Sequence, residues 1–299
     1  MRVALASDER DWHARALLAA FARAGARAVP MRLADCAFDS TAPHGLALPG
    51  LDFALPDTML VRNFGGGSFE EVTRRLGVLH ALRELGVPVW NDARAIERCV
   101  DKSTTTFLAA RAGLPVPQTW AVEGVEQARA IVAGHGGGGL VLKPLFGAQG
   151  RGLRRIESPD DLPAASELGG VYYLQRYLPP GGEGFCDHRL FVVAGDVVAA
   201  MTRRGRSWIT NIRRGGRAEA LAPDAEMRDM AARATACVGA HYAGVDLIRD
   251  REGKLFLLEV NSMPGWRGLQ SITGFSIADR LAGDLLAQID RDLSKAAAR

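Results

Sequence analysis

The amino-acid sequence predicts a fold that is α/β in its N-terminal part and α+β in the remainder. Two observations carry this prediction. Over residues 1–98, short apolar strands alternate with amphipathic helices, which is typical of a parallel sheet in a Rossmann-like domain. Beyond residue 98, most neighbouring strands are expected to pair antiparallel across turns. The chain has 299 residues, which allows for about two domains of roughly 150 residues each.

The N-terminal part carries clear helix signals. Trp12, Leu17 and Phe21 fall on one face of an amphipathic helix. Ser68 and Glu71 form a capping box that opens a second helix. The first strand is not followed by G-x-G-x-x-G, so we do not expect dinucleotide binding. The expected strands are 2–7, 26–30, 58–62 and 87–90, and the second helix ends near residue 85.

The second part mixes helices, glycine-rich loops and strands. A helix over 101–112 is ended by Gly113 and Pro115. Asp250-Arg-Glu-Gly253 reads as a turn that joins two strands into a hairpin. The expected strands are 140–143, 171–177, 189–193, 197–202, 244–249 and 254–260, and the other expected helices are 124–133, 224–238 and one from about residue 276.

Composition and charge exclude several classes of protein. Hydrophobic residues make up 47% of the chain and charged residues 24%, so extensive disorder is excluded. A net charge of +3 argues against a dedicated DNA-coating protein. No apolar run approaches the roughly 18 residues of a membrane-spanning helix, and the charged N-terminus does not fit a signal peptide. The four cysteines form no C-x-x-C pair, so we expect reduced thiols and a cytoplasmic protein.

Lysine is rare, which draws attention to the few lysines present. Of the 37 basic residues, only Lys102, Lys143, Lys254 and Lys295 are lysines. Lys143 ends an apolar strand and precedes a glycine-rich loop, a pattern that can place an ammonium and free backbone N–H groups around phosphate. An ordinary hairpin loop has the same pattern. For Lys102, at the start of helix 101–112, an ordinary surface lysine is the alternative.

Two acids and an amide flank the hairpin turn. With strand positions paired across this turn, Asp246 faces Leu257, and Glu259 lies one pair further out on the same face. Glu259 and Asn261 share that face because side chains alternate along a strand. Buried carboxylates repel one another without a cation, and carboxylate and amide oxygens suit Mg²⁺ that bridges phosphates. The alternative is that both acids are solvated at strand ends.

Arginine is concentrated in one segment. Six arginines between residues 203 and 217 can bind carboxylates or phosphates through paired N–H groups. The alternatives are a solvated loop and a nucleic-acid surface, for which Trp208 is the only stacking aromatic. Upstream, Arg62, Asn63 and three glycines precede a helix N-terminus, which is either an anion site or a tight strand-to-helix turn.

Ordered motifs across residues 90–283 resemble the ATP-grasp superfamily and, within it, the RimK-type α-L-glutamate ligases. The resemblance implies an ATP-grasp fold with a Rossmann-like pre-ATP-grasp domain at 1–98, a lid subdomain at 99–180, and a C-terminal subdomain at 181–299 with the metal and acceptor site. The motifs are Asp101-Lys102, LKPLFGAQGRG (142–152), YLQRYL (173–178), Asp187-His-Arg189, Arg203-Arg204, TNIRRGG (210–216), AGVDL (243–247), LEVNSMPGWRGLQ (258–270) and TGFSIA (273–278).

The resemblance assigns roles to individual residues. It implies ATP and two Mg²⁺ ions, replaceable by Mn²⁺, as cofactors. Lys143, Arg189 and Arg204 are the candidate catalytic residues, with the two arginines facing the acylphosphate oxygens. The implied ATP-binding residues are Lys102, Lys143, Gln175, Arg176, Tyr177, Leu178, Asp187 and Asn211; the implied metal ligands are Asp246, Glu259 and Asn261; the candidate acceptor-binding residues are Arg62, Asn63, Arg213, Trp266 and Arg267.

The implied reaction joins a carboxylate to an amine in two steps. The acceptor carboxylate attacks the γ-phosphate of ATP to give an acylphosphate and ADP, and an amine, expected to be that of L-glutamate, then displaces phosphate. The expected acceptor is a carboxylate-bearing cofactor such as a tetrahydromethanopterin-type pterin. The alternatives are a ribosomal protein C-terminus, a non-catalytic ATP-binding module, and a D-alanine-type or lysine-biosynthesis ligase. Family analogy suggests a homo-oligomer, and neither a membrane nor a nucleic acid is an expected partner.

Two positions depart from the family pattern. Arg176 follows Gln175 where the family usually has an acid, so this chain lacks an acid that would contact the nucleotide. Trp266 and Arg267 stand where the RimK pattern has an aliphatic residue and an acid. A flat aromatic beside a positive charge suggests an acceptor that is aromatic or carries several carboxylates.

Overall fold

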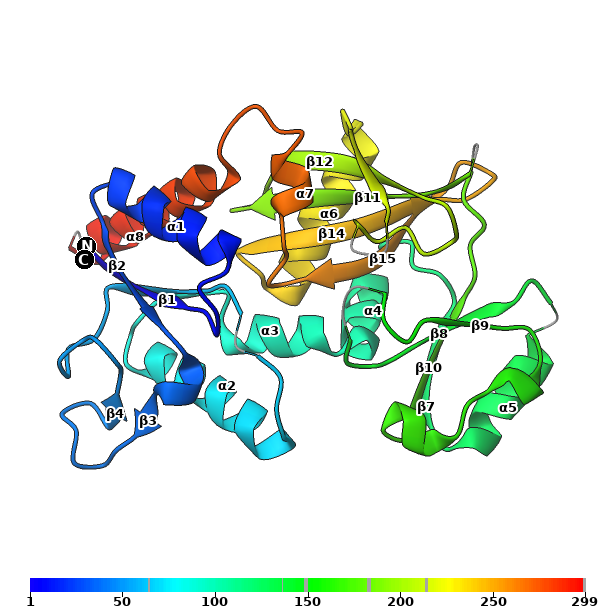
Figure 1. Ribbon diagram of the computed structural model, residues 1–299, viewed down its shortest axis with the longest axis horizontal. Coiled ribbons are helices and arrows are strands. Elements are labelled where there is room, and N and C mark those ends of the chain that lie inside the picture. The colour runs from blue at the N-terminus through cyan, green and yellow to red at the C-terminus, as the bar shows by residue number, and fades with distance from the viewer. Residues whose placement is uncertain (64, 136, 148–149, 182–183, 213–214, 298–299) are drawn as a thin grey trace.

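The computed structural model describes residues 1–63, 65–135, 137–147, 150–181, 184–212 and 215–297. Three sheets of four, four and five strands organise this part of the chain, with a small two-stranded hairpin beside the first (Figure 1). Within the described residues, no helix is long and apolar enough to cross a membrane. The mixture of a parallel N-terminal sheet and two antiparallel sheets confirms the predicted fold class.

The N-terminal sheet is parallel, in the order β2-β1-β5-β6. The predicted capping box is present: Glu71 N–H donates to Ser68 Oγ, and the Ser68 N–H donates to the Glu71 carboxylate. Helix α3 and the β3–β4 hairpin are additional to the elements expected from the sequence. The elements are β1 (Arg2–Ala6), α1 (Trp12–Arg23), β2 (Arg27–Met31), η1 (Leu33–Asp35), β3 (Ala37–Phe38), β4 (Leu46–Ala47), β5 (Thr58–Val61), α2 (Phe69–Glu84), β6 (Val89–Trp90) and α3 (Ala93–Val100).

The second sheet is antiparallel, in the order β7-β10-β8-β9, and packs α5 against one face through an apolar cluster. It stands apart from the other sheets at the right of Figure 1. Helix α4, whose first turn is capped by the Asp101 carboxylate, precedes it along the chain. The elements are α4 (Lys102–Arg111), β7 (Thr119–Glu123), α5 (Val125–Gly134), β8 (Leu140–Lys143), β9 (Arg154–Ile156), η2 (Pro159–Asp161), η3 (Ala165–Leu168) and β10 (Val171–Arg176).

The third sheet is antiparallel, in the order β13-β12-β11-β14-β15. Helix α6 covers one face with an apolar cluster, while part of the other face packs against α8 and the N-terminal domain. The elements are β11 (Phe185–Val193), β12 (Asp196–Gly205), β13 (Arg217–Ala220), α6 (Ala225–Val238), β14 (Tyr242–Arg249), β15 (Leu255–Asn261), α7 (Arg267–Gln270) and α8 (Ile277–Ala297).

The predicted register of the β14–β15 hairpin is wrong by two residues at Asp246. Regular pairing predicted that Asp246 faces Leu257, but Leu257 pairs with Leu247, so the hairpin is shifted by one residue from the prediction. The next pair is Asp246 with Glu259, which leaves Leu258 as an extra residue, as in a β-bulge. The shift and the bulge together bring Asp246 directly opposite Glu259.

The N-terminal and third sheets share one apolar core. Helices α1 and α8 lie side by side in Figure 1, and their side chains join residues of β1, β11 and β14 in a single cluster. Within this contact, Asn91 is fully buried and bonds only to backbone. Its Nδ2 donates to Tyr242 O (2.7 Å) and Ser262 O (2.6 Å), and its Oδ1 accepts from the N–H groups of His241 (2.6 Å) and Tyr242 (3.2 Å). One amide thus ties β6 to both β14 and the segment after β15.

Replacing this amide should destabilise the whole chain. Asn91→Ala leaves buried backbone donors and acceptors without partners, and we expect the free energy of unfolding to fall by about 3 kcal/mol. Urea unfolding followed by circular dichroism measures the change. The matched control is Gln288→Ala, which removes an exposed amide bonded to Asp292 and should change stability by less than about 0.5 kcal/mol. Equal stability of the two variants would contradict the assignment.

Candidate functional site

One face of the third sheet gathers most of the charged candidate residues. Side chains alternate along each strand, and the register pairs Asp187 with Arg203, Arg189 with Asp246, and Asp246 with Glu259. All of these therefore project from the same face, opposite α6. The full set on this face is Asp187, Arg189, Arg203, Asp246, Glu259 and Asn261.

Asp246 is the centre of a buried ion-pair network. It is 5% exposed, and Arg189 grips both of its oxygens, with Nε to Oδ1 and Nη2 to Oδ2 each at 2.6 Å. Arg203 Nη2 adds a third contact to Oδ2 at 2.9 Å. Burial alone would raise the pKa of Asp246, but Arg189 and Arg203 hold this pKa below its usual value. The carboxylate is therefore ionised.

Arg203 is a site residue that the sequence analysis missed. It is 4% exposed, and its Nε and Nη2 donate to the two Asp187 oxygens at 2.7 and 2.6 Å. Although burial opposes the charged form, Asp246 and Asp187 raise the pKa of Arg203, so it is a permanent cation. Counting outward from the hairpin turn, where Val193 pairs with Asp196, would place residue 202 opposite residue 187; a bulge between Phe191 and Val192 brings Arg203 there instead.

The structure places Arg204 on the other face of the sheet. Neighbouring residues of a strand point to opposite sides, so Arg204 cannot share a face with Arg203. Its Nε donates to the Glu219 carboxylate at 2.9 Å, and the side chains of both residues are about half exposed. Arg203 and Arg204 thus lie on opposite faces, and among the described arginines of this segment it is Arg203 that contacts Asp246.

Glu259 and Asn261 complete a set of hard oxygen donors. When the Asn261 amide is oriented so that its nitrogen donates to Glu259 Oε1 (3.1 Å), its oxygen accepts from Arg189 Nη2 (3.2 Å). Among the described residues, no group of three or more His, Cys, Asp or Glu side chains could hold a metal ion. Two carboxylates and an amide oxygen are nevertheless a donor set that Mg²⁺ accepts, with water or phosphate completing its shell. The residues present fit the metal that the family pattern implies.

Both candidate lysines reach this face from the lid side. Lys143 Nζ donates to Gln175 Oε1 at 2.6 Å, and burial lowers the pKa of Lys143 to about 8, with the Glu259 carboxylate partly opposing the shift. Lys102 Nζ donates to the carbonyls of Leu145 (3.1 Å) and Gly147 (3.0 Å). Burial lowers the pKa of Lys102 too, again opposed by Glu259. The two ammonium groups therefore lie within electrostatic range of the proposed metal ligands.

The glycine-rich loop packs against the segment that contains Asn211. Gly150 has φ +68°, and a Cβ there would lie 2.9 Å from Ile209 Cγ2 and 3.8 Å from Asn211 Cβ. Gly152 has φ +71°, and its Cβ would lie 2.7 Å from Pro144 Cγ. Glycine is required at both positions, because a side chain would be strained and would clash. The loop residue Gly150 is thus brought beside Asn211.

At the strand end at 175–178, an apolar cluster lies beside the hydrogen-bonded pair Gln175 and Thr119. Gln175 is 2% exposed, and its Nε2 donates to Thr119 Oγ1 at 3.1 Å. Leu178 joins Ile248, Phe256 and Leu258 in a small apolar cluster of the kind on which a flat base can lie. Arg176 is exposed, and its guanidinium carbon lies 6.0 Å from the centre of the Phe256 ring. Tyr177 is half-buried, and the Arg155 guanidinium carbon lies 4.1 Å from the centre of its ring.

The carboxyl edge of the N-terminal sheet meets the segment that follows Asn261. Arg62, directly after β5, is 7% exposed and donates from Nη1 to Met263 O at 3.3 Å. His13 Nε2 accepts from the Trp266 backbone N–H at 3.1 Å. Trp266 itself is fully buried, with the Arg62 guanidinium 5.5 Å from its ring centre. It therefore packs between the domains and presents no open ring face to a ligand.

The remaining acceptor candidates lie at the rim of this edge. Asn63 Oδ1 accepts from the Asp8 N–H at 2.7 Å. Gly65 has φ +66°, and a Cβ there would lie only 1.7 Å from Asp8 Oδ2, so this turn requires glycine. Arg267 is exposed at the start of α7. Arg213 lies outside the described residues.

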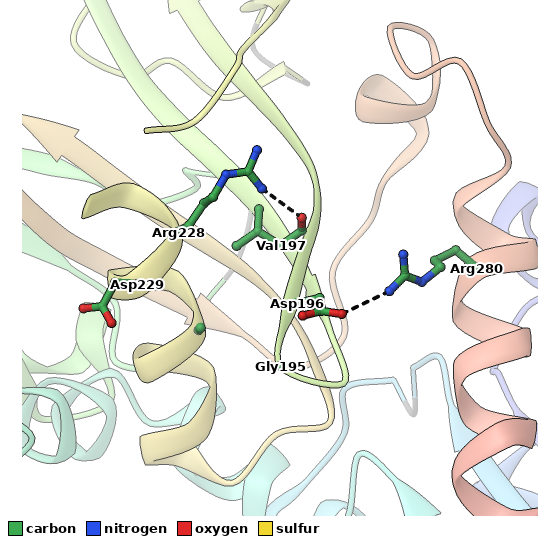
Figure 2. A pocket seen from close by; sticks show the side chains of 7 residues that line it. Gly195, Asp196, Val197, Arg228, Asp229 and Arg280 are labelled. Atoms are coloured by element: carbon green, nitrogen blue, oxygen red, sulfur yellow. Dashed lines mark hydrogen bonds and ion pairs between the residues drawn. The ribbon is translucent and has the colours of Figure 1, made fainter. Parts of the chain in front are cut away.

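A shallow pocket elsewhere contains none of these residues. It lies between the β11–β12 turn, α6 and α8, and Figure 2 shows Arg228 and Arg280 on opposite sides of it. Arg228 Nη1 donates to Val197 O (3.4 Å), and Arg280 pairs with Asp196 (3.4 Å) and Asp284 (2.6 Å). Both cations are engaged by the protein, so we assign no ligand to this pocket.

Comparisons with known proteins agree with this geometry. A family model described as the RimK-like ATP-grasp domain matches residues 99–285. A tetrahydromethanopterin:alpha-L-glutamate ligase of Methanosarcina acetivorans is 30% identical over 311 residues, covering 91% of this chain and 94% of that protein. An enzyme of the same name from Methanocaldococcus jannaschii is 35% identical over 243 residues, covering 78% and 80%.

Solved structures share the fold at lower identity. The ATP-grasp ligase PsnB, complexed with a phosphomimetic variant of its minimal precursor, Mg and ADP, superposes with a TM-score of 0.75 at 22% identity, covering 96% of this chain and 98% of that one. A RimK domain ATP-grasp protein from Sphaerobacter thermophilus gives a TM-score of 0.70 at 24% identity, covering 96% and 100%. These structures show the fold, and the match to the family model together with the relatives above shows that the chain belongs to the RimK-like ATP-grasp family.

Proposed function

We propose that this protein is an ATP-dependent carboxylate–amine ligase that adds L-glutamate to a carboxylate-bearing cofactor of the tetrahydromethanopterin type. The observation that carries the proposal is the sheet face on which Asp246, Glu259 and Asn261 lie together beneath two lysines. The names of the relatives at 30% and 35% identity supply the substrates. Because ATP-grasp ligases use ATP and Mg, the nucleotide and the metal follow from the family.

The nucleotide would lie between the lid and the third sheet. Its base would contact the apolar cluster around Leu178, and its phosphates would face Lys102 and Lys143. We assign Asp187 and Asn211 to the same nucleotide. Asp246, Glu259 and Asn261 would hold two Mg²⁺ ions, which neutralise phosphate charge when bound, and Mn²⁺ could replace them.

The chemistry follows from charge placement. The acceptor carboxylate attacks the γ-phosphorus, and the bond to ADP breaks, which gives an acylphosphate. The glutamate amine then attacks the carbonyl carbon, phosphate leaves, and the amine loses a proton. Arg189 is the arginine on the correct face to meet the acylphosphate oxygens, whereas Arg204 faces away. The lid would exclude the water that hydrolyses this intermediate.

We place the acceptor along the edge where the N-terminal sheet meets the segment after Asn261. Arg62 and Trp266 build the floor of this edge by packing on each other. Asn63 and Arg267 lie at its rim, where Arg267 can pair with an acceptor carboxylate. This arrangement suits an extended acceptor whose reacting carboxylate reaches Arg189.

A product search tests the reaction and the acceptor together. The protein is incubated with ATP, Mg²⁺, L-glutamate and the small-molecule pool of a cell extract, and mass spectrometry is used to find species heavier by glutamyl units. We expect glutamylated pterin-type species with the wild type and none with Lys143→Ala, which lacks the ammonium facing the phosphates. If glutamate is instead found on a protein C-terminus, the acceptor is a protein and the proposed cofactor acceptor is wrong. The absence of any product, with other amino acids tried too, would replace the ligase with a non-catalytic ATP-binding module.

ATP binding should weaken with rising pH. The pKa of Lys143 in the nucleotide-free protein is lowered to about 8, so its ammonium is lost as the pH rises through that value. We expect the Kd for ATP to rise between about pH 7 and about pH 9 in the wild type but to stay nearly flat in Lys143→Arg, because a guanidinium remains charged. Calorimetric titration at each pH measures the Kd. Parallel curves for the two proteins would contradict the assignment.

Arg267 should contribute to acceptor binding. Arg267→Glu reverses a charge at the rim of the proposed acceptor edge, and we expect the KM for the acceptor to rise about tenfold while the KM for ATP is unchanged. Steady-state kinetics with the acceptor identified above measures both constants. Arg129→Glu, an equal charge reversal at an exposed position of α5, is the control. An unchanged acceptor KM in Arg267→Glu would remove Arg267 from the acceptor site.

A further inference from the structure

The Arg189 guanidinium lies between two of the proposed metal ligands, Asp246 and Asn261, where a bound cation would contact both. Its Nη2 is 2.6 Å from Asp246 Oδ2 and 3.2 Å from the Asn261 oxygen, in the amide orientation that also satisfies Glu259. Its Nε takes the other Asp246 oxygen at 2.6 Å. One protein side chain thus occupies both oxygens of Asp246 and contacts the amide oxygen that completes the donor set.

Two of the three carboxylates on this face are already paired with arginines without a metal. Asp187 and Asp246 are matched by Arg189 and Arg203 in one continuous network of contacts of 2.6 to 2.9 Å. A divalent cation added beside Asp246 would meet a guanidinium at close range, and like charges at such distances in a buried setting repel strongly. The cation can bind well only if one arginine leaves the carboxylate.

Arg189 is the arginine that can leave. Its side chain is 15% exposed, and in the described network its carboxylate partner is Asp246 alone. The Arg203 side chain is 5% exposed and is also held by both oxygens of Asp187, so its removal would leave a second buried carboxylate unpaired.

We propose that Arg189 is the resident counter-ion of the metal site, and that it releases Asp246 when the cation binds. This inference rests on the metal site of the proposed function. The released guanidinium, still anchored on β11 opposite Asp246, is then free to bind an anion such as a phosphate oxygen. Cation binding and delivery of Arg189 to the anion are thereby coupled, and the cation binds weakly while no anion is present to take the arginine.

Metal binding without nucleotide tests this coupling. Free Mn²⁺ is titrated with the nucleotide-free, full-length protein and followed by electron paramagnetic resonance. We expect Arg189→Gln to bind Mn²⁺ about tenfold more tightly than the wild type or better, because it removes the competing cation. Arg189→Lys keeps a charge but cannot grip both oxygens, so its affinity should lie between the two. Arg249→Gln is the control. Arg249 also lies on strand β14 and also pairs with carboxylates, but these are Asp224 and Glu226.

A second substitution locates the gained affinity. Adding Glu259→Gln to Arg189→Gln should abolish the gain, because it removes a proposed ligand from the same face. Equal or weaker Mn²⁺ binding in Arg189→Gln than in the wild type would overturn the proposal, and so would an equal gain in Arg249→Gln. If Arg189→Gln does not fold, an Arg189→Lys affinity equal to that of the wild type overturns it instead. If the wild type forms no glutamylated product but the variants show the expected changes in Mn²⁺ affinity, the proposed function is refuted and the counter-ion role of Arg189 stands.

Discussion

The chain of buried ion pairs through Asp187, Arg203, Asp246 and Arg189 constrains the rest of the site. Each pair is cross-strand, so the network exists only while β12, β11 and β14 keep one register. Removing one partner of such a buried pair costs about 3–5 kcal/mol, because it leaves an unpaired charge away from water. The sheet therefore holds its ligands in place before any substrate arrives. The same contacts that maintain the register also present Asp246 in its ionised form.

The N-terminal domain fixes the other side of the site. Residues 262–266 follow Asn261 directly, and three side chains from the first domain bond to their backbone: Asn91 to Ser262 O, Arg62 to Met263 O, and His13 to the Trp266 N–H. Trp266 is buried beneath these contacts. A movement of the first domain would consequently move the strand end that carries Asn261.

Lys102 and Lys143 add positive charge near the carboxylates of the sheet face. Lys102 bonds to two carbonyls around the glycine-rich loop, and Lys143 bonds to the neutral Gln175, so neither ammonium is tied to a carboxylate by these contacts. Their hydrogen bonds to neutral groups cost less to exchange than ion pairs, which suits groups that must turn to incoming phosphates. Arg189, by contrast, has to give up an ion pair. This difference distinguishes Lys102 and Lys143, which we propose contact the ATP phosphates, from Arg189, which we propose is displaced when the metal binds.

The sequence by itself determined most of the elements and part of the candidate site. Apolar alternation, the Ser68–Glu71 capping box and the hairpin turns placed most strands and helices, and the motifs identified Lys143, Asp246, Glu259 and Asn261. Only the tertiary structure decided three other matters. The pairing of β14 with β15 is shifted by one residue from the predicted register and has a bulge at Leu258, so counting from the turn misplaced Asp246. Choosing Arg203 over Arg204 required the strand pairing that sets which face each side chain takes. The burial of Trp266 depends on contact with the N-terminal domain, where its partner His13 is 253 positions away in the sequence. Local periodicity carries no signal over such a separation.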